Sequence, residues 1–372
     1  MRIFLSGGAV RDLLLGREAT DKDYLVFDAE PDEFLTAFPR AQRVGKSFPV
    51  FMLDGSEYVF PRALPLEKDL QLRDLTVNAM LLGPDCELIC HEKALDDISN
   101  RVLRPASNRS MTDDPLRVIR SARFSAQLPE FTVLPELLDA MRDCAEKGLL
   151  DTPPPDRVAR EVEKAMNAPR PGNFLRTLAK ADCLEPWFNE FAHAASIPAG
   201  PPEHHDSDVL EHTCRVMDEC AKRWPGNALT VWMALCHDLG KTSTPAEDLP
   251  KHIGHEGRGE AAAGKMAMRN RMPNRFLHAG ITAAAEHMKA ARYLEMRPAK
   301  RVDLIMRGRK NACLRELFRL VLVDSGIDLR QRVREDTKAV LGVKLPAELQ
   351  NLGEESGRRL REMRAAKITR PL

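Results

Sequence analysis

The sequence lacks the features that would place it at once among zinc-binding, secreted or membrane proteins. Its eight cysteines contain no Cys-x-x-Cys pair, and no second ligand pair follows Cys86 and Cys90 at a matching spacing. We therefore expect reduced, mostly structural thiols. No apolar run approaches the length of a membrane span, and the first residues do not form a signal-peptide pattern. Together these absences predict a cytoplasmic protein with no membrane partner.

The chain also lacks a large net charge, but its charges are unevenly distributed. The formal net charge is +1 for 372 residues. Residues 297–372 carry 19 Lys and Arg against 10 Asp and Glu, whereas residues 1–296 carry 37 against 45. A basic C-terminal part suits a polyanionic partner, although a solvated helical surface would give the same composition.

No internal repeat is evident, and the pattern of the chain changes near residue 110. Strand-like stretches are expected at residues 2–6, 23–27, 49–53, 57–60 and 87–90, and helical periodicity dominates from residue 114 onward. The Pro- and Gly-rich residues 196–205 indicate a linker. The length favours more than one domain. We predict an α+β head at residues 1–108, a helical neck and body at 109–195, and a helical C-terminal region at 196–372.

The stretch FLSGGAVRDLLLGREATDKDYLVF, residues 4–27, contains the first candidate site. A strand that ends at Gly7 and Gly8 and leads into a helix presents backbone N–H groups to a phosphate, and Arg11 adds positive charge. Asp21 and Asp23 alternate along the next strand, so both carboxylates face one side. Such a pair suits Mg²⁺ and phosphoryl transfer, although Asp-x-Asp also occurs in surface turns.

Together these residues resemble the signature of the polymerase β-like nucleotidyltransferases, and GGAVRD…DKD resembles that of the class II tRNA nucleotidyltransferases, the CCA-adding family. Five further motifs occur in the family order: VGKSFPVF, LRDLTVNAM, LDDISNRVLRP, DDPLRVIRSARF and DRVAREVEKAM. The resemblance implies that Asp21 and Asp23 hold Mg²⁺ and are catalytic. It also implies that Gly7, Gly8 and Arg11 bind the triphosphate, and that Arg73 and Asp74 contact the nucleotide. Glu57 is a candidate third carboxylate.

The resemblance gives the neck motif a role in choosing the base. Asp114 and Arg117 stand three residues apart on an expected helix, and their side chains can pair with the edge of a base. In the family such a pair selects CTP and then ATP for addition to tRNA. Asp113 stands where the family usually has Glu. Asp113, Arg120 and Arg157 complete the candidate nucleotide-binding set. A surface ion pair would explain the same spacing.

The connection between Arg62 and Leu72 is short, with only ALPLEKDLQ between them. In the family, enzymes that add A usually carry a longer flexible loop there, and its loss marks CC-adding enzymes. The resemblance therefore predicts addition of C residues and little or no terminal A.

A second candidate site contains the string HDLGK, which directly follows an apolar helical run. Histidine and aspartate in this helical pattern resemble the HD metal-dependent phosphohydrolases, and these ligands suit Mn, Ni or a similar ion. The resemblance implies a metal held by His212, His237, Asp238 and Asp328, with Asp324 as the alternative to Asp328. His204, Lys241, His252 and His255 would bind phosphate or water. An HD fold that has lost hydrolysis would give the same pattern.

Three other functions remain open from the sequence. They are a stand-alone phosphohydrolase or 2′,3′-cyclic phosphodiesterase acting on RNA ends, a poly(A) polymerase, and a non-catalytic RNA-binding protein. The paired carboxylates argue against the last, because binding alone does not require them.

Overall fold

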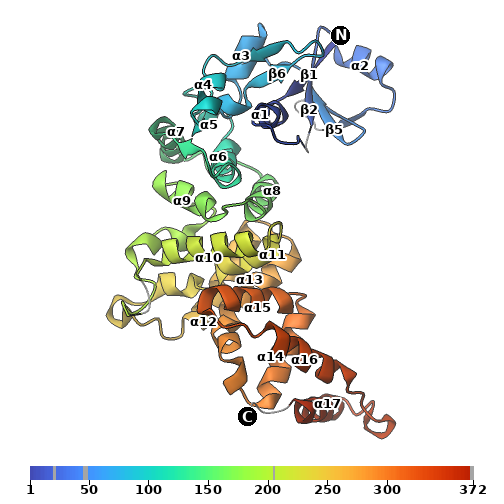
Figure 1. Cartoon of the computed structure of the whole chain (residues 1–372), viewed down its shortest axis with the longest axis vertical. Helices are drawn as coiled ribbons and strands as arrows, with labels where there is room; N and C mark the ends of the chain where they lie inside the picture. Colours follow the sequence, from blue (N-terminus) through green and yellow to red (C-terminus); the bar gives the residue numbers. More distant parts are fainter. Residues whose placement is uncertain (20–21, 45–48, 204–205, 369–372) are drawn as a thin grey trace. The chain divides into compact units, whose positions relative to one another are not determined.

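The computed structural model describes residues 1–372 except 20–21, 45–48, 204–205 and 369–372 (Figure 1). Contacts divide the chain into two compact units. The first comprises Met1–Pro153 with Lys180–Cys183, and the second comprises Pro154–Ala179 with Leu184–Leu372. The α+β class with a sheet-containing N-terminal part and a helical remainder is confirmed. The division into three functional regions stays a prediction.

In the described part of the first unit, a mixed seven-stranded sheet has the order β3-β4-β5-β2-β1-β6-β7. Strand β2 pairs antiparallel with β1 and parallel with β5. All five strands expected from the sequence are present, and β3 and β6 were not expected. The bounds are β1 Arg2–Ser6, β2 Asp23–Phe27, β3 Gln42–Val44, β4 Val50–Leu53, β5 Ser56–Val59, β6 Met80–Leu82 and β7 Leu88–Cys90.

Each face of this sheet carries its own apolar core. Leu25 belongs to a cluster with Phe4 and Leu70, whereas its neighbour Val26 belongs to one with Phe34 and Phe51. Successive strand residues point to opposite faces, so DYLVF contributes to both cores. Helix α3 (Leu66–Gln71) covers one face through Leu70, and α2 (Pro31–Ala37) covers the other through Phe34.

The rest of the first unit is mainly helical. Helices α5 (Ser110–Asp113), α6 (Leu116–Gln127) and α7 (Pro135–Glu146) follow α1 (Gly8–Leu14) and α4 (Ala94–Ser99) along the chain. The short strands β8 (Val102–Leu103) and β9 (Thr132–Val133) pair with each other. Helix α6 is buried over most of its length, in agreement with the helical periodicity of its sequence.

The second unit is built around α11 (Ala228–Cys236), whose residues are almost all buried. A helix that is apolar all round belongs in a core, and α11 packs against α10, α13 and α15. The helices of this unit are α8 Pro155–Met166, α9 Gly172–Lys180, α10 Val209–Arg223, α11, α12 His255–Arg269, α13 Asn274–Ala291, α14 Pro298–Lys310, α15 Leu314–Ser325, α16 Arg330–Gly342 and α17 Glu354–Lys367. The last residue of α9, Lys180, is grouped with the first unit.

The stretch expected to be a linker, residues 196–205, does not separate the two units. Its described residues belong to the second unit, where the carbonyl oxygens of Pro198 and Ala199 accept hydrogen bonds from His252 and Lys241. Every cysteine lies in the described part of the chain and is a free thiol. Among the described residues, no helix is both long and apolar enough to span a membrane.

Candidate active sites

The glycine pair forms the turn between β1 and α1. Gly7 has φ of 71° and ψ of −131°, a conformation that L-residues with a side chain rarely adopt, and its N–H donates to the carbonyl of Met80 at 2.9 Å. Helix α1 begins at the next residue, Gly8. A strand, a glycine turn and a helix start therefore follow one another, as expected for a phosphate-binding turn.

Arg11 begins a buried chain of polar side chains. Its Nη1 donates to Oδ1 of Asn78 at 2.6 Å, and Nδ2 of Asn78 donates to Oδ1 of Asp74 at 3.1 Å. Arg120 completes the chain, donating through Nη2 and Nε to Oδ2 of Asp74 at 2.7 and 2.9 Å. Burial alone would raise the pKa of Asp74, but Arg120 outweighs it and holds the pKa well below its ordinary value. Residues of three separate sequence motifs thus meet here.

The candidate metal-binding edge lies at the beginning of β2. Asp23 is exposed and lies opposite Glu57 in the parallel β2–β5 register, so their side chains emerge next to each other. Ser6, the last residue of β1, is the partner of Asp23 on the other side. Asp21 lies outside the described residues. Asp23 and Glu57 therefore supply a pair of neighbouring carboxylates near the glycine turn.

The neck residues have different surroundings from one another. Arg117 is buried and donates to the carbonyls of Leu72, Ser110 and Arg73 at 2.6, 3.0 and 3.2 Å. Asp114 follows α5 in an extended conformation, so it does not share a helix with Arg117 as expected. Asp113, the last residue of α5, pairs with Arg109 at 2.9 Å. In this conformation the Arg117 guanidinium supports the backbone around residue 72. Arg157 is exposed on α8 in the second unit.

The short connection after Arg62 is a helix held at both ends. Asp69 of α3 is buried, and its Oδ1 accepts from the backbone N–H of Arg62 at 2.7 Å. Its Oδ2 accepts from Nη2 of Arg73 at 3.0 Å. The Asp69 carboxylate therefore links Arg62, which precedes the connection, to Arg73, which follows it.

The second unit brings His212, His237, Asp238 and Asp324 together. The two Nε2 atoms of His212 and His237 lie 3.3 Å apart, and Oδ2 of Asp238 lies 3.3 and 3.2 Å from them. Oδ1 of Asp324 lies 3.3 Å from His212 Nε2 and 3.6 Å from His237 Nε2. The core helix α11 ends directly before His237, so the packing of the unit fixes this pair.

A second group shares the same aspartate. Among the described residues, the candidate metal-ligand groups are His212–His237–Asp238 and Asp238–His255–His287. Oδ1 of Asp238 lies 3.4 Å from Nε2 of His287 and 3.6 Å from Nε2 of His255. The sequence interpretation gave no role to His287. Its signal was weak, because it lies in an alanine-rich helix with no metal-binding motif around it.

Three of these histidines are oriented through their other ring nitrogen. Nδ1 of His237 lies 2.7 Å from the carbonyl oxygen of Ala234, and Nδ1 of His255 lies 2.8 Å from that of His252. Nδ1 of His287 lies 3.0 Å from the carbonyl of Ala283. A carbonyl can only accept, so each Nδ1 carries a proton and each ring directs its Nε2 atom into the cluster.

The electrostatics of the cluster favour a cation. Burial alone would lower the pKa of His237, but Asp238 and Asp324 outweigh it and raise the pKa to about 10. Contacts from His212 and His237 keep the pKa of Asp324 below its ordinary range, although burial alone would raise it. Oδ1 of Asp238 and Nε2 of His255 are buried without a hydrogen-bond partner. These orphaned acceptors and the mixed nitrogen and oxygen donor set fit a divalent transition metal.

The remaining predicted residues of this region are placed differently. Asp324, not Asp328, faces the histidines, which reverses the sequence preference. Asp328 is exposed and held by Arg330 at 2.7 and 2.8 Å. Lys241 contacts Oδ2 of Asp238 at 2.7 Å. His252 uses both ring nitrogens on Thr244 and Pro198, so it does not point into the cluster. His204 lies outside the described residues.

Two family models match separate segments of the chain. A family model described as the poly A polymerase head domain matches residues 3–56, and one described as a probable RNA and SrmB-binding site of polymerase A matches residues 130–194. The multifunctional CCA protein of Stenotrophomonas maltophilia strain R551-3 is 38% identical over 330 residues, covering 82% of this chain and 80% of the relative. That of Methylococcus capsulatus is 36% identical over 329 residues, covering 82% and 76%.

Solved structures show the same fold. The CCA-adding enzyme of Bacillus stearothermophilus in complex with CTP superposes with a TM-score of 0.69 at 21% identity, over 98% of this chain and 88% of that chain. The Thermotoga maritima CCA-adding enzyme complexed with tRNA gives 0.63 at 19%, over 100% and 88%.

Proposed function

The chain belongs to the family of the multifunctional CCA proteins, and from that membership we propose that it is a tRNA nucleotidyltransferase that adds C residues from CTP to the 3′ end of tRNA. The observation that carries the proposal is the meeting of the glycine turn, the Asp23–Glu57 edge and the Arg11–Asn78–Asp74–Arg120 chain in one unit.

In this proposal, Asp21, Asp23 and, as a third candidate, Glu57 hold Mg²⁺. Mg²⁺ neutralises phosphate charge and activates the attacking hydroxyl when it is bound. Gly7, Gly8 and Arg11 receive the triphosphate, and the Asp74 chain keeps Arg11 in position. Because phosphoryl transfer depends mainly on positioning and charge neutralisation, no covalent enzyme intermediate is needed.

We expect tRNA lacking all three terminal nucleotides to gain two C residues and little or no A. Cytosine and adenine present different edges, so one template must change shape between them. The segment after Arg62 has little slack, because it is helical and Asp69 ties it to Arg62 and Arg73. Incubation with CTP, ATP or both, followed by sizing of the products, tests this.

A tRNA that already ends in CC is the control substrate for that experiment. Efficient AMP incorporation onto it would contradict the CC preference and give the full CCA addition for which the relatives are named. Failure to add C to any tRNA would contradict the nucleotidyltransferase proposal itself.

The template role rests on Asp114 and Arg117. We expect Asp114→Ala to reduce the preference for CTP over UTP by on the order of 10-fold, because a bidentate base contact contributes about 1–3 kcal/mol. The KM for CTP should change less, since the phosphates are bound elsewhere. Single-nucleotide addition with each triphosphate measures this. Asp139→Ala is the matched control, since it removes an exposed carboxylate, paired with Arg142, from α7 of the same unit. Unchanged discrimination in Asp114→Ala would exclude the role.

A second function is favoured by the geometry of the histidine cluster. We propose that the second unit is a metal-dependent phosphohydrolase acting on phosphate esters of RNA ends. Its support is the convergence of the Nε2 atoms and the orphaned Oδ1 of Asp238. His212, His237, Asp238 and Asp324 would hold the ion, and His255 and His287 would face a second ion or the phosphate. A bound transition metal lowers the pKa of its water.

A further inference from the structure

A cavity of about 700 Å³ lies in the second unit, away from the residues assigned above. Trp224, at the end of α10, forms part of its wall, and the other walls come from α14, α15 and α16. Its charged lining among the described residues is Arg309, Arg315, Arg319, Arg330, Arg334 and a single carboxylate, Glu316. The cavity is therefore strongly positive.

The Trp224 ring holds two of these guanidinium groups. Cζ of Arg319 lies 5.0 Å from the ring centroid, and Cζ of Arg330 lies 5.8 Å from it. A guanidinium that stacks through its face keeps its N–H edge available for planar acceptors such as phosphate. Stacking therefore positions the donors before any ligand arrives.

Two donors of the cavity have unmet hydrogen-bonding capacity. Nη1 of Arg319 and Oγ1 of Thr337 are buried and make no hydrogen bond. The Glu316 carboxylate oxygen that lies 3.8 Å from Nη1 already accepts from Arg315 at 3.1 Å. Buried donors without acceptors are rare in folded proteins and call for an explanation.

The outer arginines add charge that the fold leaves uncompensated. Arg309 and Arg334 are exposed, and neither has a carboxylate partner in the part of the chain that the structure describes. Arg330 is different, because Asp328 neutralises it at 2.7 Å. Burial, together with the nearby Arg315, lowers the pKa of Arg319.

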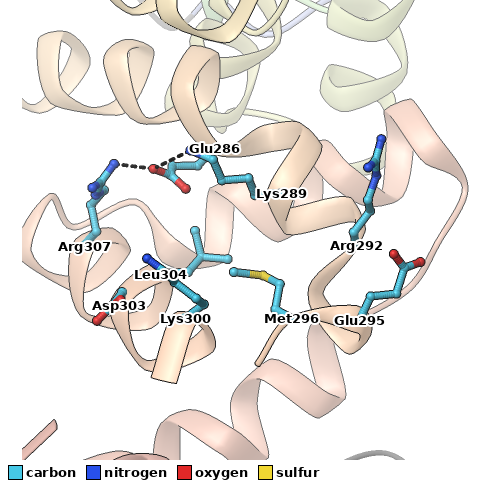
Figure 2. Close-up of a pocket in the computed structure, with 9 residues that line it drawn as sticks. All are labelled: Glu286, Lys289, Arg292, Glu295, Met296, Lys300, Asp303, Leu304 and Arg307. Atoms are coloured by element: carbon cyan, nitrogen blue, oxygen red, sulfur yellow. Dashed lines mark hydrogen bonds and ion pairs between the residues drawn. The ribbon is translucent and has the colours of Figure 1, made fainter. Parts of the chain in front are cut away.

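A neighbouring cavity shows what internal compensation looks like. The cavity in Figure 2, about 450 Å³, is lined by both signs of charge. There Glu286 pairs with Arg307 and Lys289, and Asp303 pairs with Arg361 from α17. Its lining has four cations and three carboxylates, whereas the lining of the Trp224 cavity has five arginines and one carboxylate.

We propose that the Trp224 cavity is a binding site for the sugar-phosphate backbone of RNA. This proposal rests on the proposed function, in which tRNA is the substrate. The cavity has more cations than one phosphate requires, and it lies within the basic residues 297–372 apart from Trp224. Arg309, Arg319 and Arg334 supply donors to phosphate oxygens, and Thr337 supplies a hydroxyl at the wall.

The test compares two double variants of the full chain. Arg309→Ala with Arg334→Ala removes two cavity charges. Arg358→Ala with Arg359→Ala removes two exposed charges from α17 that are already paired with Glu355 and Glu362. Fluorescence anisotropy measures the Kd of tRNA lacking its CCA end at several KCl concentrations.

We expect the cavity variant to bind tRNA on the order of 10-fold more weakly, with a salt slope smaller by about 1–2, since each phosphate contact contributes roughly 0.7–0.9. The α17 variant should stay within about twofold of the wild type. An unchanged Kd and salt slope in the cavity variant would overturn the proposal. So would an equal loss in both variants, which would show general charge attraction.

CMP is the remaining probe. The Kd of CMP is measured for the wild type and for the cavity variant. If the cavity variant loses affinity for CMP by the same factor as for tRNA, the site binds free nucleotides and the RNA assignment is overturned. Binding does not depend on catalysis. If the wild type transfers no CMP, the proposed function is wrong. A Kd for RNA that rises in the cavity variant would still support this binding site.

Discussion

Asp23→Ala is expected to lower the rate of CMP transfer to tRNA by on the order of 1,000-fold, which corresponds to about 4 kcal/mol of lost transition-state stabilisation. The side chain is exposed at the start of β2 and lies beside Glu57. Its removal should leave the apolar cores intact and take away a ligand for Mg²⁺. Single-turnover transfer from CTP, at saturating Mg²⁺ and tRNA, measures the effect.

Two further variants separate charge from folding in that experiment. Asp23→Asn keeps the shape of the side chain and should lose nearly as much activity as Asp23→Ala, because an amide is a poor ligand for Mg²⁺. Asp96→Ala removes an exposed carboxylate from α4 of the same unit and should remain within about twofold of the wild type. Near-normal transfer by both Asp23 variants would exclude the proposed mechanism.

His237→Ala is expected to abolish metal-dependent phosphate ester hydrolysis, by at least about 1,000-fold, and to leave CMP transfer within about twofold. Nε2 of His237 points at the carboxylates of Asp238 and Asp324, and the candidate transfer residues lie in the other unit. The assay would follow 2′,3′-cyclic nucleotide and p-nitrophenyl phosphate with Mn²⁺, Ni²⁺, Co²⁺ or Mg²⁺.

His252→Ala is a matched control for this prediction, because His252 is directed at Pro198 and Thr244 and not into the cluster. His237→Gln guards against loss of folding, since it preserves much of the side-chain volume. Loss of both activities in a folded His237 variant would refute two independent sites. No hydrolysis by the wild type with any of the four metals would refute the phosphohydrolase proposal.

Local sequence patterns sufficed for much of the fold. The short apolar run in DYLVF predicted β2, and the apolar run before HDLGK predicted the buried helix that ends directly before His237. The glycine turn was also predictable, because glycine tolerates the positive φ that Gly7 adopts. These features depend on neighbours within a few residues, for which single-sequence patterns carry the information.

Pairings between distant residues were not predictable in the same way. Asp74 and Arg120 are 46 positions apart, and no local pattern distinguishes a buried partner from a nucleotide ligand. Asp324 and Asp328 lie on opposite sides of a turn. Helix α15 ends at Ser325, and Gly326 reverses the chain with φ of 74°. The last turn of the helix therefore faces the histidines, and the residue beyond the glycine does not.

The buried chain from Arg11 to Arg120 has a consequence for where the protein can be cut. A fragment that ended at residue 108 would keep the whole sheet but lose Arg120, and Asp74 would then be a buried carboxylate without its cation. Breaking such a pair costs about 3–5 kcal/mol, and the lower end applies because the Arg120 side chain is 34% exposed. Against a typical total of roughly 5–15 kcal/mol, that is enough to make the isolated head marginal. A fragment intended to fold by itself should therefore extend at least through α6.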